Sequence, residues 1–308
     1  MRIKIIHATS YTYAIPVRSI LQLLRVTPRP HAGQQVVNWR LNADADVRLR
    51  WTEDPFGNIV HCLSTERPVD RLTLTVTGEI ATTDSAGVVG GAVERMPRAV
   101  YLRHTPRTRA DDAIADLARA ADPGTEAGDL ARLHALMGAV AGAVSFDVGA
   151  TDVGTSAADA LKLGRGVCQD LAHVFISAAR VLGIPARYVS GHLLRTDGAE
   201  QVASHAWAEA DVPGLGWVGF DPTNGVCPTE SYVRIAIGLD YLDAAPVRGA
   251  RDGGGVETMA VDLKVAPGRE PMGQRQAQGG QVQTMGGMRQ SQSHQTQSQQ
   301  MQSQQMRA

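Results

Sequence analysis

Apolar and polar residues alternate along the first part of the chain. Residues 72–77 alternate apolar side chains with threonines, and residues 3–7 begin a similar run near the N-terminus. Alternation with a period of two predicts half-buried β-strands, because successive side chains of a strand point to opposite faces. The Asp, Pro, Gly and Asn residues of the cluster 54–58 predict a hairpin turn between two such runs. We therefore expect residues 1–85 to form an antiparallel β-sandwich.

Helical periodicity replaces this alternation further along the chain. A Gly- and Pro-containing segment, residues 86–107, is expected to be a linker. Apolar residues then recur every three or four positions, which predicts amphipathic helices, the last of them ending at the Gly-Ile-Pro sequence of residues 183–185. Strand-like runs follow that helix. Residues 108–247 are therefore expected to be a second domain of helices packed on an antiparallel sheet, which makes the fold class α+β.

The composition changes again near the C-terminus. Gln dominates residues 274–308, Ser, Gly and Met supply most of the remainder, and Leu, Ile and aromatic residues are absent there. A segment of this composition cannot bury enough apolar surface to offset the entropy lost on ordering. We therefore expect residues 248–308 to form a disordered, low-complexity tail.

Length and charge exclude some classes of protein. The 308 residues include 30 Lys and Arg against 31 Asp and Glu, so the net charge of −1 provides no overall field for nucleic acid. No apolar run approaches the ~20 residues that cross a bilayer. Charged residues interrupt the N-terminus, which is unlike a signal peptide. These features predict a cytoplasmic protein without nucleic-acid or membrane partners.

The cysteines and histidines show no pattern typical of a metal site. Cys62, Cys168 and Cys227 lie far apart, which argues against a disulfide framework and a cysteine-rich zinc site. The histidines outside the motifs discussed below lack metal-ligand spacing. We expect neither a metal nor another cofactor, and we interpret Cys62 and Cys227 as small apolar residues that fill space.

Cys168 is the candidate nucleophile. It lies where a Gly-containing turn meets the first turn of a strongly amphipathic helix. The unpaired N–H groups and partial positive charge of a helix N-terminus favour a thiolate, which is the reactive form of cysteine. The same N–H groups could stabilise an oxyanion. Asp170 is expected to interact favourably with the helix N-terminus, and His173, about 140° round the helix, to be a packing residue.

His205 and Asp221 are the candidate proton shuttle and its orienting acid. A turn centred on Pro213-Gly214 would place Asp221 opposite Ala206, beside His205, whereas a turn one residue later would move it about 7 Å along the strand. In the first register the carboxylate would accept a hydrogen bond from Nδ1–H of His205, as in catalytic triads. Trp207 and Trp217 are interpreted as cross-strand packing residues.

These residues belong to motifs that resemble the transglutaminase-like superfamily core. The motifs are GVCQDLAH (166–173), GIPARYVSG (183–191), SHAWAE (204–209) and GWVGFDPT (216–223). The N-terminal half is similar to the β-domain that precedes this core in a bacterial branch. Its matching residues are Tyr13, Pro16, LRVTP (24–28) and Phe56-Gly57-Asn58. The resemblance covers residues 1–245.

The resemblance implies a papain-like core in which Cys168 is the nucleophile, His205 the general acid/base and Asp221 the orienting acid. The implied substrate is a protein or peptide, attacked at a Gln side chain or a peptide bond through a thioester. Water as acceptor would make the protein a peptidase or amidase, and an amine would make it a transglutaminase; we favour hydrolysis. Two alternatives remain: a non-catalytic peptide-binding module and a small-molecule acyltransferase.

Overall fold

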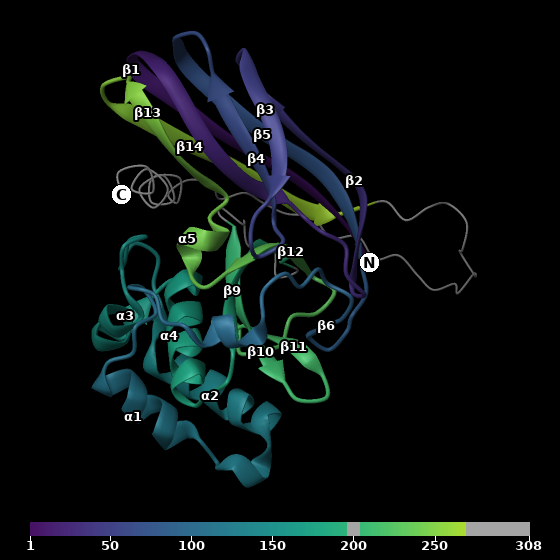
Figure 1. Cartoon of the computed structure of the whole chain (residues 1–308), viewed down its shortest axis with the longest axis vertical. Coiled ribbons are helices and arrows are strands. Elements are labelled where there is room, and N and C mark those ends of the chain that lie inside the picture. The colour runs from purple at the N-terminus through teal and green to yellow at the C-terminus, as the bar shows by residue number, and fades with distance from the viewer. Residues whose placement is uncertain (196–203, 269–308) are drawn as a thin grey trace, which may run out of the picture.

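The structure, a computed structural model, describes residues 1–195 and 204–268 and shows two regions (Figure 1). An antiparallel β region lies beside a core of helices and a second sheet. The α+β architecture expected from the sequence is therefore confirmed. The first five strands of the β region are β1 (Arg2–Thr27), β2 (Gln34–Ala43), β3 (Val47–Glu53), β4 (Ile59–Thr65) and β5 (Val69–Thr82).

The long strand β1 organises the β region. The strands follow the order β2-β5-β1-β4-β3, and β13 (Val247–Gly253) and β14 (Glu257–Pro267) also pair with β1. The first half of β1 pairs with β5 and β14, and its second half pairs with β4 and β13. Apolar side chains from both halves, among them Tyr11 and Leu24, form one shared core with Leu63 of β4. One strand thus joins all seven strands into a single antiparallel sheet, where the sequence predicted a sandwich.

The predicted start of the C-terminal tail is wrong. Residues 248–267 were expected to be disordered, but most of them belong to β13 and β14. The reason is a period-two pattern that the composition of the following residues obscures: Met259 and Leu263 are buried on one side of β14, which pairs with β1 from Ile3 to Tyr13. The Gln-rich stretch of residues 274–308 lies outside the described residues.

The core region contains five helices and a five-stranded sheet within the described residues. Its sheet has the order β12-β9-β10-β11-β6. The helices are α1 (Asp112–Ala121), α2 (Asp129–Ala143), α3 (Ala157–Leu163), α4 (Cys168–Val181) and α5 (Tyr241–Ala244). The strands of the sheet are β6 (Val88–Val89), β9 (Ala186–Leu193), β10 (His205–Val212), β11 (Gly216–Phe220) and β12 (Tyr232–Gly238). The short elements are β7 (Ser145–Phe146), β8 (Arg165–Gly166) and the 3-10 helices Arg98–Leu102 and Thr125–Ala127.

Residues 86–107, the expected linker, are partly built into this core. The strand β6 pairs with β11 and extends the sheet. Tyr101 is fully buried, and its ring contacts Trp217 edge-on with ring centroids 4.9 Å apart. A buried aromatic side chain fixes its segment against the sheet, so this stretch is a component of the core as well as a connection.

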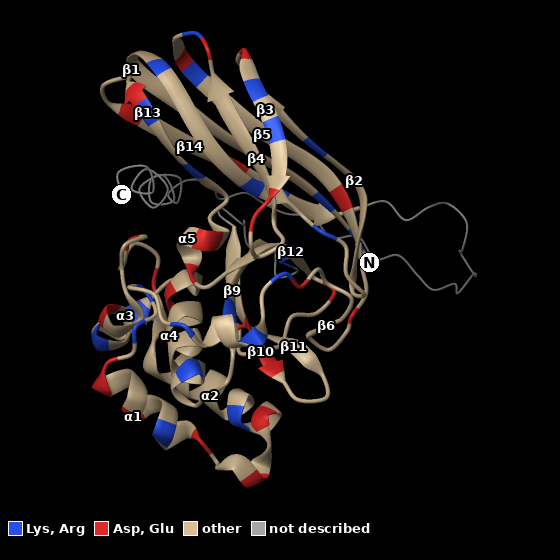
Figure 2. Ribbon diagram, viewed as in Figure 1, with Lys and Arg blue, Asp and Glu red and all other residues tan. Residues whose placement is uncertain are grey.

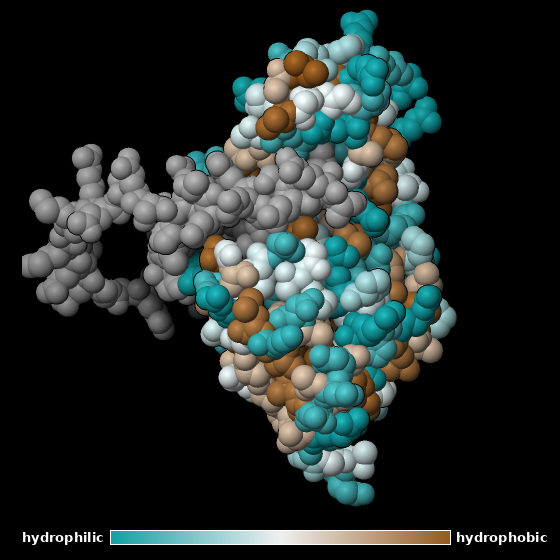
Figure 3. All heavy atoms as spheres, turned by 90° about the vertical axis from the view of Figure 1, so that its left-hand side faces the viewer, coloured by the Kyte–Doolittle hydropathy of each residue, from teal (hydrophilic) through white to brown (hydrophobic). Residues whose placement is uncertain are grey.

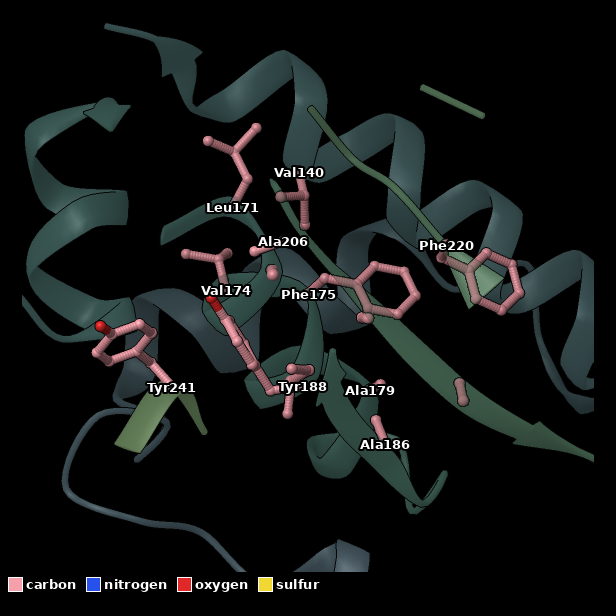
Figure 4. Packing of buried hydrophobic residues seen from close by; sticks show 14 of the residues in the cluster. Val140, Leu171, Val174, Phe175, Ala179, Ala186, Tyr188, Ala206, Phe220 and Tyr241 are labelled. Carbon is pink, nitrogen blue, oxygen red and sulfur yellow. The ribbon is translucent and has the colours of Figure 1, made fainter. Parts of the chain in front are cut away.

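Helix α4 is the central helix of the core. All its residues from Gln169 to Arg180 are buried. Ala206, Ala208 and Ala210 of β10 belong to the same apolar cluster, and their small side chains allow the helix to lie close to the strand. Figure 4 shows Leu171, Val174 and Phe175 of this helix among that cluster. This packing holds the N-terminus of α4, where Cys168 lies, at a defined place against the sheet.

Charged and apolar side chains are mixed over the surface. Basic and acidic residues are interspersed over both regions (Figure 2), and brown apolar residues alternate with teal polar ones on the face in Figure 3. Along residues 1–195 and 204–268, no helix is both long and apolar enough to cross a membrane.

Candidate active site

The turn before Cys168 is fixed by a buried carboxylate. Asp170 Oδ2 accepts hydrogen bonds from the backbone N–H of Val167 at 2.8 Å and from the Thr151 hydroxyl at 2.5 Å. A Cβ atom on Gly166 would lie only 2.7 Å from Asp170 Oδ2, so the close approach of the turn to Asp170 needs a glycine there. The GVCQD sequence therefore has a local structural reason, which is to begin α4 at Cys168.

Asp170 lies in a low-dielectric environment. Its side chain is fully buried, and burial raises its pKa to about 6, although the hydrogen bonds from Thr151 and Val167 partly oppose the shift. It stabilises the turn and the helix N-terminus, which agrees with the role expected from the sequence.

His205 and Asp221 lie side by side. His205 is the first residue of β10, and Asp221 directly follows β11. The His205 Nε2 and Asp221 Oδ2 atoms are 2.7 Å apart. The other carboxylate oxygen accepts the backbone N–H groups of Thr223 at 3.0 Å and Asn224 at 3.3 Å, as in an Asx turn. Asp221 is fully buried, so these bonds fix its orientation.

Two details of this pair differ from the sequence-based expectation. The turn does centre on Pro213-Gly214, with Leu215 N–H bonded to Val212 O at 3.0 Å, but the ladder pairs Val212 with Gly216. The loop between the paired residues is therefore residues 213–215, three residues long. The positive φ of Gly216, 79°, accommodates the additional loop residue. Both registers considered from the sequence are wrong by one residue. The ring nitrogen that faces the carboxylate is Nε2, whereas Nδ1 was expected.

Asn224 and Tyr232 complete the surroundings of Asp221, and the sequence analysis missed both. Asn224 Nδ2 donates to Asp221 Oδ2 at 2.6 Å, and Tyr232 Oη donates to the same oxygen at 2.8 Å. Asn224 follows the motif that contains Asp221 by one residue, so its position in the turn was a usable signal. Tyr232 lies on β12, which is not a neighbour of β11 in the sheet, and no local pattern indicates its role.

His205 is linked to both Asp221 and Cys168. Burial alone would lower the pKa of His205, but its hydrogen bonds with Asp221 and Cys168 and the charges of both residues outweigh burial and raise the pKa to about 10. Burial acts against the charged form of Asp221 as well, yet hydrogen bonds from His205, Asn224 and Tyr232 keep its pKa below the usual value. The arrangement favours the charged imidazolium form of His205 beside the Asp221 carboxylate.

The remaining residues singled out from the sequence lie apart from this pair or pack around it. His173 is fully buried, and its Nε2 accepts the backbone N–H of Tyr241 at 3.0 Å, as expected of a packing histidine. Trp207 packs beneath His205 with ring centroids 6.1 Å apart. Cys62 and Cys227 are half-buried, free thiols. Within the part of the chain that the structure describes, no group of three or more His, Cys, Asp or Glu side chains could hold a metal ion.

Two family models match the chain. The bacterial transglutaminase-like N-terminal region matches residues 3–81, which lie in the β region. The transglutaminase-like superfamily matches residues 116–222, a span that contains Cys168, His205 and Asp221.

Curated relatives match over most of the chain. An uncharacterized protein of Mycobacterium leprae is 31% identical over 282 residues, covering 86% of this chain and 98% of that protein. An uncharacterized protein of Mycobacterium tuberculosis is 28% identical over 278 residues, covering 80% of this chain and 87% of its own.

A solved structure shares the fold. The crystal structure named "a Putative Cysteine Protease from Cytophaga hutchinsonii" matches with a TM-score of 0.71 at 22% identity, covering 88% of this chain and 92% of that one. The likeness extends over both regions, and at this identity it shows the fold alone. The two matched family models and the Mycobacterium leprae relative show that the chain belongs to the transglutaminase-like superfamily and carries the bacterial transglutaminase-like N-terminal region.

Proposed function

We propose that this protein is a thiol enzyme that cleaves amide bonds through a thioester on Cys168. The observation that carries the proposal is the position of the His205 imidazole, which is hydrogen-bonded to Asp221 and lies close enough to Cys168 for that residue to raise the pKa of His205. A nucleophile, a base within reach of it and a third group that orients the base are the three components of such catalysis. The superfamily fold supports the proposal.

The first half-reaction forms the acyl-enzyme. The Cys168 thiolate attacks the amide carbonyl carbon, and the backbone N–H groups at the start of α4 stabilise the oxyanion. The C–N bond then breaks, and the amine or ammonia leaves with the proton of the His205 imidazolium. Asp221 keeps the imidazole in one orientation throughout and stabilises its charged form.

The second half-reaction releases the acyl group. A water molecule attacks the thioester carbon and gives a proton to His205 as the C–S bond breaks, which yields a carboxylic acid and restores the thiolate. An amine in place of water would give a new amide by the same steps. We favour water as the acceptor, and proteins or peptides with Gln side chains or accessible peptide bonds as substrates.

Mass spectrometry of a Gln-rich peptide mixture tests the proposal. Wild-type protein is expected to cleave peptides or to convert Gln to Glu with a gain of about one mass unit, and Cys168→Ala is expected to lower the rate at least about 1,000-fold. Cys62→Ala is the matched control, since it removes another half-buried free thiol and should leave the rate unchanged.

A primary amine in the reaction identifies the acceptor. Amine incorporation that depends on Cys168 would keep the acyl-enzyme but overturn water as the preferred acceptor. Unchanged peptides, together with a Cys168 that resists alkylation at neutral pH, would overturn the enzyme and favour a peptide-binding module.

A further inference from the structure

The strand β12 forms one edge of the core sheet, and the β region covers its outer side. Three buried polar side chains of the β region reach this segment: Gln34 at the start of β2, Asn58 before β4 and Thr82 at the end of β5. Asn58 belongs to the Phe56-Gly57-Asn58 motif that the proposed chemistry does not use. An uncovered strand edge would leave unpaired N–H and C=O groups, so these contacts satisfy a real structural need.

Gln34 and Asn58 each bond one residue of β12 as a neighbouring strand would. Gln34 Nε2 donates to Arg234 O at 2.8 Å, and Gln34 Oε1 accepts Arg234 N–H at 2.8 Å. Asn58 Nδ2 donates to Ile237 O at 2.7 Å, and Asn58 Oδ1 accepts Ile237 N–H at 2.8 Å. We call these two side chains the amide clamp.

A bulge in β12 allows both halves of the clamp to bind. Arg234 pairs with Gly191 of β9 while Ala236 pairs with Ser190, so Ile235 is an additional residue. In a regular edge strand the outward backbone groups recur every second residue. The additional residue turns the groups of Arg234 and Ile237, three positions apart, to the same outer edge.

The strand β12 also contains Tyr232, whose hydroxyl group holds Asp221 in place. Tyr232 Oη donates to Asp221 Oδ2 at 2.8 Å, and its ring packs edge-on against Trp207 with centroids 5.4 Å apart. Phe56 of the β region packs against the cluster that contains both rings. Two residues before Tyr232, Glu230 O accepts the Thr82 hydroxyl at 2.6 Å. The β region thus contacts β12 on both sides of Tyr232.

We propose that the β region is a positioning element for the triad, in which the amide clamp on β12 sets the place of Tyr232, and the Tyr232 hydroxyl holds Asp221 against His205. The inference rests on the proposed function. Tyr232 and Asn58 are positioning residues, because they act through Asp221. Small misplacements of catalytic groups lower the rate steeply, so holding the strand edge at two residues preserves the geometry of the triad.

Rates of Cys168 alkylation provide a measurement that needs no known substrate. The variants are Asn58→Leu, Tyr232→Phe and the double variant in the full chain, with Asn42→Leu, an exposed Asn on β2, as the matched control. Tyr232→Phe removes a hydrogen bond to the charged Asp221 carboxylate, and Asn58→Leu removes half of the clamp that positions Tyr232. Each single variant should therefore lower the alkylation rate about tenfold. The alkylation rate of the double variant should stay within about twofold of that of the slower single variant, since both changes act through the hydrogen bond from Tyr232 to Asp221.

A pH profile with iodoacetate separates positioning from a general loss of structure. The titratable groups that face His205 are Cys168 on α4, Asp221 after β11 and Tyr232 on β12. Because Asp221 contributes to the raised pKa of His205, the alkaline limb, where His205 loses its proton and no longer attracts the anionic reagent, should move to lower pH in both single variants.

The outcomes separate this inference from the proposed function. Multiplicative effects in the double variant, or an Asn58→Leu rate equal to that of Asn42→Leu, would overturn the inference while leaving the enzyme in place. An unreactive Cys168 in the wild type would overturn the proposed function itself. If Asn58→Leu folds poorly, Gln34→Ala against its exposed neighbour Gln35→Ala tests the same clamp, with the same expected shift of the alkaline limb.

Discussion

Two ion pairs, one in the β region and one in the core, lie in different surroundings. In the β region, Arg48 of β3 pairs with Glu66, which follows β4, while their side chains remain 58% and 63% exposed. In the core, Arg187 Nε lies 2.6 Å from Glu209 Oε2, and both side chains are fully buried. Arg234 bonds the other oxygen of the same carboxylate at 2.6 Å. Water thus solvates the Arg48–Glu66 pair, whereas the core encloses Arg187 and Glu209.

This difference shows which residues need partners at fixed places. Exposed pairs contribute little to stability because water solvates each member almost as well. Buried charges cost free energy to desolvate, so each must meet its partner with good geometry. Burial alone would raise the pKa of Glu209, but Arg234 and Arg187 outweigh it and lower the pKa to about 2. The position of Arg187 is further set by Trp217, whose ring centroid lies 3.8 Å from the guanidinium carbon.

Removing the buried carboxylate should have the largest effect on stability. Glu209→Gln leaves Arg187 with Glu94 as its remaining counter-charge and removes the carboxylate that Arg234 bonds, and we expect a loss of ~3–5 kcal/mol in the free energy of unfolding. Urea unfolding followed by circular dichroism measures it. A loss below about 1 kcal/mol would show that the enclosed network is solvated like a surface pair, and its contrast with the Arg48–Glu66 pair would disappear.

The boundary between the two regions should be sensitive to acid. His7 of β1 and His192 of β9 meet edge-on there, with ring centroids 5.7 Å apart. Burial lowers the pKa of His7 to about 4, despite an opposing effect of Asp262, and lowers that of His192 to about 3. Both imidazoles are therefore neutral in the folded protein at pH values where the unfolded chain, with a pKa near 6.5, already binds protons.

The sign of the pH dependence follows from these lowered pKa values. Each histidine contributes stability that is present above pH 6.5 and is lost as the pH falls towards its folded pKa. His7 alone should account for ~2–3 kcal/mol of the loss between pH 6.5 and about 4.5. Urea unfolding of wild type and His7→Phe at both pH values gives the comparison. Equal acid-induced losses in the two proteins would contradict the assignment to His7.

The exposed pair should show the smallest effect. Glu66→Gln makes the same chemical change as Glu209→Gln but on the surface of the β region. We expect the free energy of unfolding to change by less than ~0.5 kcal/mol, because both side chains are already solvated. A loss comparable to that of Glu209→Gln, in the same urea titration, would remove the distinction between the exposed and the enclosed pair.

Much of the fold was predictable because its patterns are local. Leu72, Leu74 and Val76 alternate with polar residues, and all three are buried in β5. Ser156 begins α3 and Gly164 ends it, as their capping preferences predict. The boundary of the tail was not predictable from composition, because Met259 and Leu263 become informative only when β1 is known to lie beside them.

The candidate site likewise has parts that the local sequence predicts and parts that it does not. Cys168 could be placed at a helix N-terminus from its own neighbours, and the alternation around His205 predicted a strand. The register that brings Asp221 to His205 depended on one glycine, Gly216, whose positive φ lengthens the turn by a residue. A one-residue change of register moves each side chain to the other face of the sheet, but consecutive residues of β11 are buried, so the apolar pattern does not distinguish the two registers.

By itself, the sequence determined the elements of this protein and the residue types that could react, because helix starts, strand alternation and the Cys, His and Asp motifs depend on neighbours a few positions away. Only the tertiary structure decided which groups surround Asp221 and what holds them. Tyr232 reaches the carboxylate from another strand, and Asn58 reaches β12 across 179 residues of sequence. Such contacts arise from packing between distant segments, and no local pattern along the chain records them.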